Sequence, residues 1–99
     1  MYGLQSKLLA KPGQRDALIA LLLEGSRGGA MPGCWLYVVS EVDGEPDAIE
    51  VFEVWADKAA HDASLQLETV RTAIAKARPL MAGMGGSTAL RPVGGQGLG

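Results

Sequence analysis

The chain has 99 residues, 47% of them hydrophobic and 20% charged, and its formal net charge is −2. This length predicts one small domain, which we place at residues 1–95 with a flexible tail at residues 96–99. The charge excludes a broad basic surface for nucleic acid, and no apolar run approaches the ~20 residues that cross a bilayer. The single cysteine excludes an internal disulfide and, with no signal peptide apparent at the N-terminus, a cytoplasmic protein is expected.

The first half of the chain predicts a strand, a helix and a hairpin. Apolar and polar residues alternate over residues 2–10, which is the period of a half-buried strand. Leucines recur at helical spacing over residues 13–27, and the two glycines that follow are expected to end this helix. Aromatic and β-branched residues gather at residues 34–42 and 48–56, and the Asp-Gly-Glu-Pro-Asp segment between them predicts a hairpin turn.

The second half predicts one long helix and a last strand. Asp57 is a natural N-cap for a helix that continues to the proline at position 79, with Ser64 capping or kinking it. We expect a loop over residues 81–86 and a strand over residues 87–93. The proline in that strand has no N–H group, so the strand should lie at a sheet edge or end its pairing there.

The predicted order is β-α-β-β-α-β, the α+β ferredoxin-like arrangement with a four-stranded antiparallel sheet. Helices cover one face of such a sheet, and the other face would carry apolar and aromatic groups here. An apolar sheet face in water is unfavourable. Pairing two copies face to face would bury it and enclose a pocket.

Four segments stand at the spacing of a known family. They are Met-Pro-Gly-Cys at 31–34, Phe-Glu-Val-Trp at 52–55, His-Asp-Ala-Ser at 61–64 and Leu-Arg-Pro-Val-Gly-Gly at 90–95. Together they resemble the antibiotic biosynthesis monooxygenase domain family of dimeric α/β-barrel proteins, over roughly residues 1–95. The resemblance implies a homodimer with a strand-exchanged barrel and a mainly apolar pocket in each protomer.

The resemblance fixes the fold better than the function. Some members of the family are cofactor-independent oxygenases of polycyclic phenols, anthrones or quinols, whereas related members degrade haem or isomerise small sugars. Many members read His-x-x-Ser-x-His, but here the last position is Gln66, which puts in doubt any mechanism that needs the second histidine. No histidine follows His61, which disfavours haem degradation.

His61 and Trp55 are the predicted catalytic pair. An imidazole gains and loses a proton near neutral pH, so His61 is a candidate base for a phenolic proton, or alternatively a structural residue at the end of the Glu53 and Trp55 strand. Trp55 offers a flat surface and one N–H donor for an aromatic ligand, or alternatively fills the core. Glu53 needs a partner when buried, either His61 or Arg71, as a structural ion pair or as an acid.

The other predicted substrate-binding residues are Tyr37, Gln66, Arg71 and Met81. Tyr37 shares a strand face with Trp35, so it donates to a substrate if that face points into the barrel and belongs to the core if it points at the helices. Gln66 is a hydrogen-bond donor, and Arg71 faces either a substrate anion or solvent. Met81 is one of the loop methionines that suit an adaptable apolar pocket.

These residues favour a homodimeric monooxygenase that oxidises a small aromatic quinol or polyketide phenol with O₂, with no cofactor and no metal. A non-catalytic protein that binds a small hydrophobic ligand, or serves in a stress response, is the alternative from another class. A metal-free isomerase is a third. Enzyme and binder are distinguished by whether His61 faces the cavity near Trp55.

Overall fold

The computed structural model describes residues 1–27 and 31–98. The two glycines expected to end the first helix, Gly28 and Gly29, lie outside these residues, as does Gly99 of the expected tail. The elements, in chain order, are β1 (Tyr2–Ala10), α1 (Arg15–Arg27), β2 (Cys34–Glu41), β3 (Ala48–Trp55), α2 (Lys58–Ser64), α3 (Glu68–Ala77), the 3₁₀ helix η1 (Arg78–Leu80) and β4 (Met81–Leu90).

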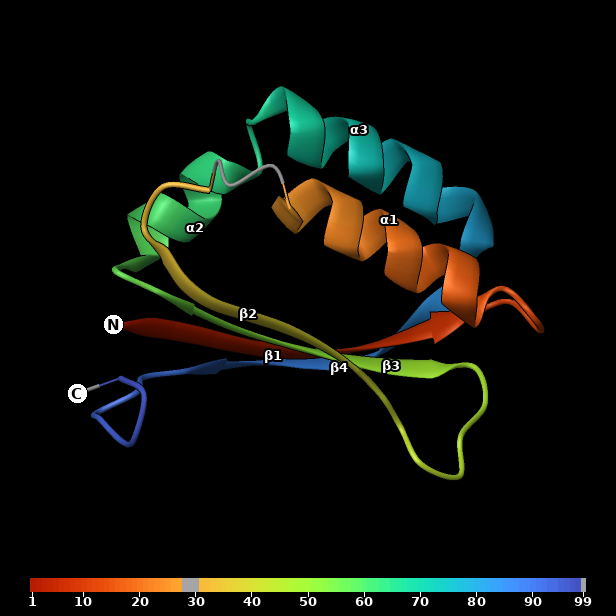
Figure 1. Cartoon of the computed structure of the whole chain (residues 1–99), viewed down its shortest axis with the longest axis horizontal. Coiled ribbons are helices and arrows are strands. Elements are labelled where there is room, and N and C mark those ends of the chain that lie inside the picture. The colour runs from red at the N-terminus through yellow and green to blue at the C-terminus, as the bar shows by residue number, and fades with distance from the viewer. Residues whose placement is uncertain (28–30, 99) are drawn as a thin grey trace.

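The strands form one antiparallel four-stranded sheet in the order β2-β3-β1-β4. All the helices lie on one side of this sheet, with α1 and α3 side by side and α2 near the N-terminal end of β1 (Figure 1). This arrangement confirms the predicted ferredoxin-like fold class. β4 is an edge strand that ends before Pro92, as the missing N–H of that proline predicted.

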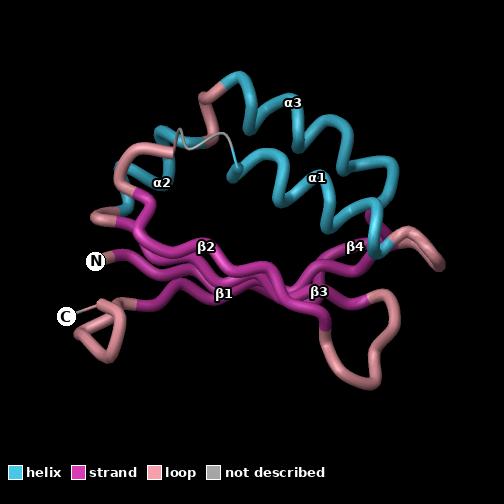
Figure 2. Tube along the Cα trace, viewed as in Figure 1, coloured by secondary structure: helices cyan, strands magenta, loops and turns pink. Residues whose placement is uncertain are grey.

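The core lies between α1 and the sheet. It contains Leu18 of α1, fully buried, against Leu8 of β1 and Ile49 and Val51 of β3. The helix α3 packs mainly against α1 and η1 rather than on the strands. The tube view shows α3 in this outer position above the sheet (Figure 2). The space under α2 and α3 is therefore filled less completely than the core under α1.

Two expectations about the second half of the chain are wrong. Residues 81–86 form the first part of β4 rather than a loop, because β1 offers them a strand edge: Leu8, Leu9 and Ala10 pair with Met84, Gly83 and Met81 across two register shifts. These bulges and the positive φ of Gly86 accommodate a glycine-rich strand that sequence propensity disfavours.

The predicted long helix is divided into α2 and α3. Asp57 caps α2 as expected, its carboxylate accepting from the N–H of Ala60 at 2.7 Å. The hydroxyl of Ser64 donates to the carbonyl of His61 at 2.6 Å in the last turn of α2, and α3 begins again at Glu68. None of the helices in the described ranges is long and apolar enough to cross a membrane.

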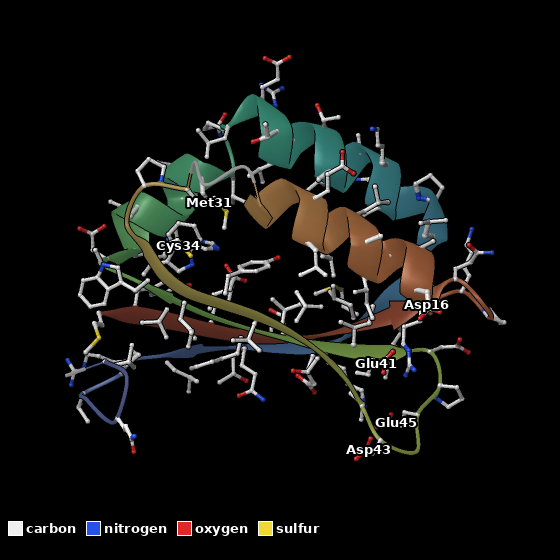
Figure 3. The ribbon with its side chains drawn as sticks, viewed as in Figure 1. Asp16, Met31, Cys34, Glu41, Asp43 and Glu45 are labelled. Carbon is white, nitrogen blue, oxygen red and sulfur yellow. The ribbon has the colours of Figure 1, made fainter. Side chains whose placement is uncertain are left out.

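The hairpin between β2 and β3 lies far from α2 and is held by ion pairs. Lys7 lies 2.7 Å from Glu45, and Arg15 lies 3.1 Å from Glu41. These acidic side chains gather at the hairpin end of the molecule, whereas Met31 lies at the opposite end, beside the start of β2 (Figure 3). The charged and the predicted functional ends of β2 are thus separated by the length of the strand.

Candidate functional site

A cavity of about 500 Å³ lies between the sheet and the helices α2 and α3. Most of its wall is aliphatic or methionine, including Leu8, Val70, Ile74, Ala77, Met81 and Met84. Polar side chains enter it from β2, β3, α2 and the start of η1, namely Tyr37, Glu53, Trp55, His61, Ser64 and Arg78. A pocket of this size and lining suits a small, mainly apolar molecule with a few polar groups.

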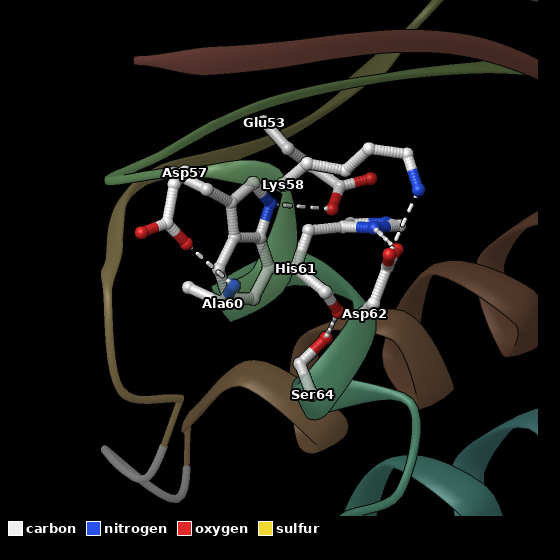
Figure 4. Close-up of polar contacts among 8 residues, drawn as sticks. Glu53, Asp57, Lys58, Ala60, His61, Asp62 and Ser64 are labelled. Carbon is white, nitrogen blue, oxygen red and sulfur yellow. Dashed lines mark hydrogen bonds and ion pairs between the residues drawn. The ribbon is translucent and has the colours of Figure 1, made fainter.

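Glu53 and Trp55 are held together on the cavity side of β3. They stand two residues apart, so the pleat of the strand points both side chains to the same face. The indole N–H of Trp55, which is 1% exposed, donates to Glu53 Oε1 at 3.0 Å (Figure 4). The hydrogen-bond partner of Glu53 is therefore Trp55, while His61, one of the two partners that the sequence suggested, acts on the carboxyl through its charge.

Burial raises the pKa of the Glu53 carboxyl above its ordinary value, against the lowering effects of the Trp55 hydrogen bond and the charge of His61. A carboxyl in a largely apolar cavity loses hydration that the ionised form needs, so the neutral acid is favoured. The carboxyl thus keeps its proton to a higher pH than an ordinary glutamate.

His61 faces the cavity beside Trp55. Its ring makes an edge contact with the Trp55 ring at a centroid distance of 5.6 Å and a tilted contact with Tyr2 at 5.4 Å. Its side chain is 14% exposed, and Nδ1 lies 3.0 Å from Asp62 Oδ1 (Figure 4). We expected an enzyme to have His61 facing the cavity near Trp55, and His61 has this position.

Asp62 determines which ring nitrogen of His61 carries the proton. Its other oxygen accepts from Lys58 at 2.8 Å, and the hydrogen bonds from Lys58 and then His61 lower the pKa of its carboxyl. An ionised carboxylate only accepts hydrogen bonds, so Nδ1 of the imidazole must donate. In the neutral imidazole the lone pair then lies on Nε2, and no described residue forms a hydrogen bond with that atom.

Tyr37 enters the cavity from β2, directly opposite Glu53 in the strand register. Burial, and to a lesser extent the charges of Glu53 and Cys34, raise the pKa of Tyr37 to about 12. A register shift between Cys34 and Leu36 leaves Trp35 55% exposed. Both alternatives from the sequence placed Tyr37 and Trp35 on one strand face, whereas their environments differ. Tyr37 faces the helices, as one alternative had it, and also lines the cavity.

The structure places the remaining predicted residues in two locations. Met81 lines the cavity. Gln66 and Arg71 are exposed and border a separate shallow depression with Thr72, so the structure does not bring them to His61.

Sequence reasoning missed several residues of the site. Asp62 follows His61 directly, and neighbours in a helix do not generally face each other, so spacing gave no signal. Arg78 reaches the cavity because it begins η1, which turns the chain into an early β4. Within residues 1–27 and 31–98, no three His, Cys, Asp or Glu side chains are arranged to hold a metal ion.

The family model described as antibiotic biosynthesis monooxygenase matches residues 1–76. Among solved structures, the chain is similar to a candidate antibiotic biosynthesis monooxygenase from Chloroflexus aurantiacus J-10-fl, with 51% identity, 99% of this chain and 98% of that chain covered, and a TM-score of 0.93. No protein in the curated set matches the chain at a significant level.

More distant structures share the fold. A candidate of the same description from Deinococcus radiodurans is 26% identical, with 96% of this chain and 95% of that chain covered and a TM-score of 0.81. One from Caulobacter crescentus CB15 is 22% identical, with 94% and 90% covered and a TM-score of 0.86. The described architecture thus belongs to a fold with many relatives.

Proposed function

This chain belongs to the antibiotic biosynthesis monooxygenase family, and from that premise we propose that its cavity oxidises a small aromatic quinol, anthrone or polyketide phenol with O₂. The observation that carries the proposal is the placement of His61. Its ring lines the cavity beside Trp55 while Asp62 engages its Nδ1, which leaves Nε2 for a substrate.

His61 is the base in this proposal. The imidazole takes a proton from the phenol, or from the methylene of an anthrone, at Nε2, and Asp62 stabilises the imidazolium that forms. The anionic substrate is electron-rich enough to reduce O₂ by one electron, and the two radicals then combine to form a carbon–oxygen bond.

The remaining steps balance without a further reductant. The imidazolium returns its proton to the peroxide, the O–O bond breaks, water leaves and a carbonyl forms on the ring. An anthrone and O₂ thus give an anthraquinone and water, and a hydroquinone gives a hydroxyquinone and water. One oxygen atom enters the product and the other enters water.

Trp55 and the apolar wall have the binding role. The indole is a buried part of this wall, and its N–H is already engaged by Glu53. The methionines Met81 and Met84 supply adaptable contacts to rings of different shape.

The alternative is a non-catalytic protein that holds a hydrophobic ligand in the same cavity. Its support is the aliphatic lining, which would serve a binder equally well. A binder, however, has no use for the base character of His61.

Oxygen uptake with hydroquinones and anthrones tests the proposal. The assay contains a chelator and no added flavin, and autoxidation in buffer sets the background. We expect uptake well above this background and, with ¹⁸O₂, one labelled atom in the product. His61→Ala should reduce the rate by about 100-fold or more. Glu68→Gln, an exposed change on α3, should leave it unaltered.

Two results would count against the proposal in different ways. Uptake that survives in His61→Ala would keep the activity and remove His61 as the base. Uptake at the autoxidation background, together with saturable binding of the same compounds, would favour the binding protein.

A further inference from the structure

We propose that Tyr37 and Glu53 form an oxyanion-binding pair, in which the phenol hydroxyl and the neutral carboxylic acid donate hydrogen bonds to the oxygen that becomes negative when His61 removes the substrate proton. This inference rests on the proposed function for the class of ligand, an ionisable arenol or aryl ketone. Neither residue has a role in the proton transfer itself.

The geometry places the two side chains together. Tyr37 on β2 and Glu53 on β3 are register partners of an antiparallel pair, and both line the same cavity. Side chains directly opposite in such a pair have Cβ atoms ~4.5–5.5 Å apart, so one ligand oxygen can reach both heads. His61 lines the cavity from α2, where its ring contacts the ring of Trp55.

The Tyr37 hydroxyl and the second carboxyl oxygen of Glu53 are both available to a ligand. The buried side-chain polar atom without a partner among the described residues is Arg15 Nε, far from the cavity. The Tyr37 hydroxyl and Glu53 Oε2 form no hydrogen bond with any described residue. Neither atom is sealed from solvent, and both residues line the cavity, so a ligand there can approach both groups.

The Trp55 bond determines which Glu53 oxygen carries the proton. Oε1 accepts the indole N–H at 3.0 Å, so a proton on the carboxyl resides on Oε2, the oxygen left for the ligand. A neutral acid beside a tyrosine hydroxyl is a strong donor pair for an enolate or phenolate in an apolar site.

Burial, rather than a neighbouring charge, favours this neutral state, against the Trp55 hydrogen bond and the charge of His61 on α2. Burial is the largest influence and raises the pKa of Glu53. From β2 the titratable neighbours are Tyr37, whose pKa is raised to about 12, and Cys34, whose pKa is raised by burial and by Glu53. Leu4, its partner on β1, carries no charge, and the remaining cation of the cavity wall is Arg78 of η1.

The pair should give anion binding a characteristic dependence on pH. Glu53 donates below its raised pKa and repels an anion above it. Glu53→Gln keeps the acceptor for Trp55 and presents a permanent N–H donor at the position of Oε2. The variant should therefore match the wild type at low pH and exceed it at high pH.

The probe is 4-nitro-1-naphthol, whose anion is coloured and which is not oxidised by O₂ under these conditions. Its affinity is measured by absorbance titration between pH 4.5 and 8.5 for the wild type, Glu53→Gln and Tyr37→Phe. The ratio of Glu53→Gln to wild-type affinity cancels the ionisation of the probe. We expect this ratio to rise about 10-fold or more across the range.

Tyr37→Phe should weaken anion binding by about 10-fold at low pH, and the Glu68→Gln control should show a constant ratio near one. A ratio for Glu53→Gln that stays constant or falls with pH, or full affinity in Tyr37→Phe, would overturn the proposal. Because the assay involves no turnover, these results are independent of whether His61→Ala abolishes oxygen uptake.

Discussion

The indole N–H of Trp55 donates to Glu53 Oε1 at 3.0 Å, and this bond links the aromatic surface of the cavity to its acidic group. Trp55 is almost completely buried, so its ring cannot turn away, and Glu53 is held at a fixed orientation beside it. The bond supplies the buried tryptophan with an acceptor and leaves one carboxyl oxygen for the cavity. Trp55 thus serves both packing and the polar geometry of the site.

Trp55→Phe should raise the pKa of Glu53 further. The Trp55 hydrogen bond lowers that pKa at present, while burial raises it, so removing the donor leaves burial less opposed. A ¹³C-carboxyl NMR titration would measure the shift, and Glu50 on the opposite face of β3 serves as the internal reference. The variant should also lose on the order of 1–3 kcal/mol in free energy of unfolding. A Glu53 titration that moves downward would contradict this account.

Glu53→Gln should gain stability relative to the wild type as pH rises. The pKa of Glu53 is raised on folding, so its favourable contribution is complete below the ordinary value of 4.5 and is lost as pH rises through the folded value. The difference in unfolding free energy between variant and wild type should therefore increase from about pH 4.5 and then level off.

Chemical denaturation at a fixed protein concentration would measure this difference at several pH values. Glu68→Gln removes an exposed carboxyl from α3 and serves as the control over the same range. A flat profile for Glu53→Gln would mean that burial has little effect on the carboxyl.

Asp62→Ala should reduce the oxidation rate without abolishing substrate binding in the cavity. The imidazole of His61 loses the acceptor for its Nδ1–H, so the tautomer with a lone pair on Nε2 is no longer favoured. We expect kcat/KM to fall about 10-fold, the small end of the range for such orienting partners, because Asp62 is half exposed.

The ¹⁵N shifts of the imidazole give a second readout for this prediction. The wild type should show a proton on Nδ1, and Asp62→Ala should shift the balance toward Nε2. Asp62→Asn keeps an oxygen acceptor and should retain the wild-type tautomer. Unchanged ¹⁵N shifts in Asp62→Ala would show that Asp62 does not orient the ring.

The sequence was sufficient for the fold and for three residues of the cavity's polar end. Alternation in β1 and β3 gave the correct faces, so Glu53 and Trp55 were expected on one side of the same strand, and His61 was expected in the helix that follows. These are local relationships, and the periods of strands and helices express them directly.

Nonlocal relationships were harder to predict. The start of β4 depends on hydrogen bonds to β1, some seventy residues earlier, which outweigh the weak strand propensity of its glycines. The separation of Tyr37 from Trp35 depends on a bulge that strict alternation cannot anticipate. The division of α2 from α3 moved Gln66 and Arg71 away from the cavity.

The outer face of the sheet predicts a homodimer. Leu36, Val38 and Leu90 lie on the side away from the helices and are 37%, 40% and 39% exposed. Lys7 and Glu50 are register partners on the same face. Two copies could therefore bury this apolar surface without burying charges of one sign alone. We expect the wild type to sediment as a dimer at micromolar concentration.

Val38→Asp should dissociate this dimer. A carboxylate at the centre of the apolar face would be buried without a partner, at a cost of several kcal/mol. Each 1.4 kcal/mol changes the dissociation constant about tenfold, so the variant's constant should rise about 100-fold or more. Sedimentation velocity over a concentration series measures it, and Thr72→Asp adds the same charge on the helix side as a control. A monomeric wild type, or a Val38→Asp variant as dimeric as the control, would show that this face is not the interface.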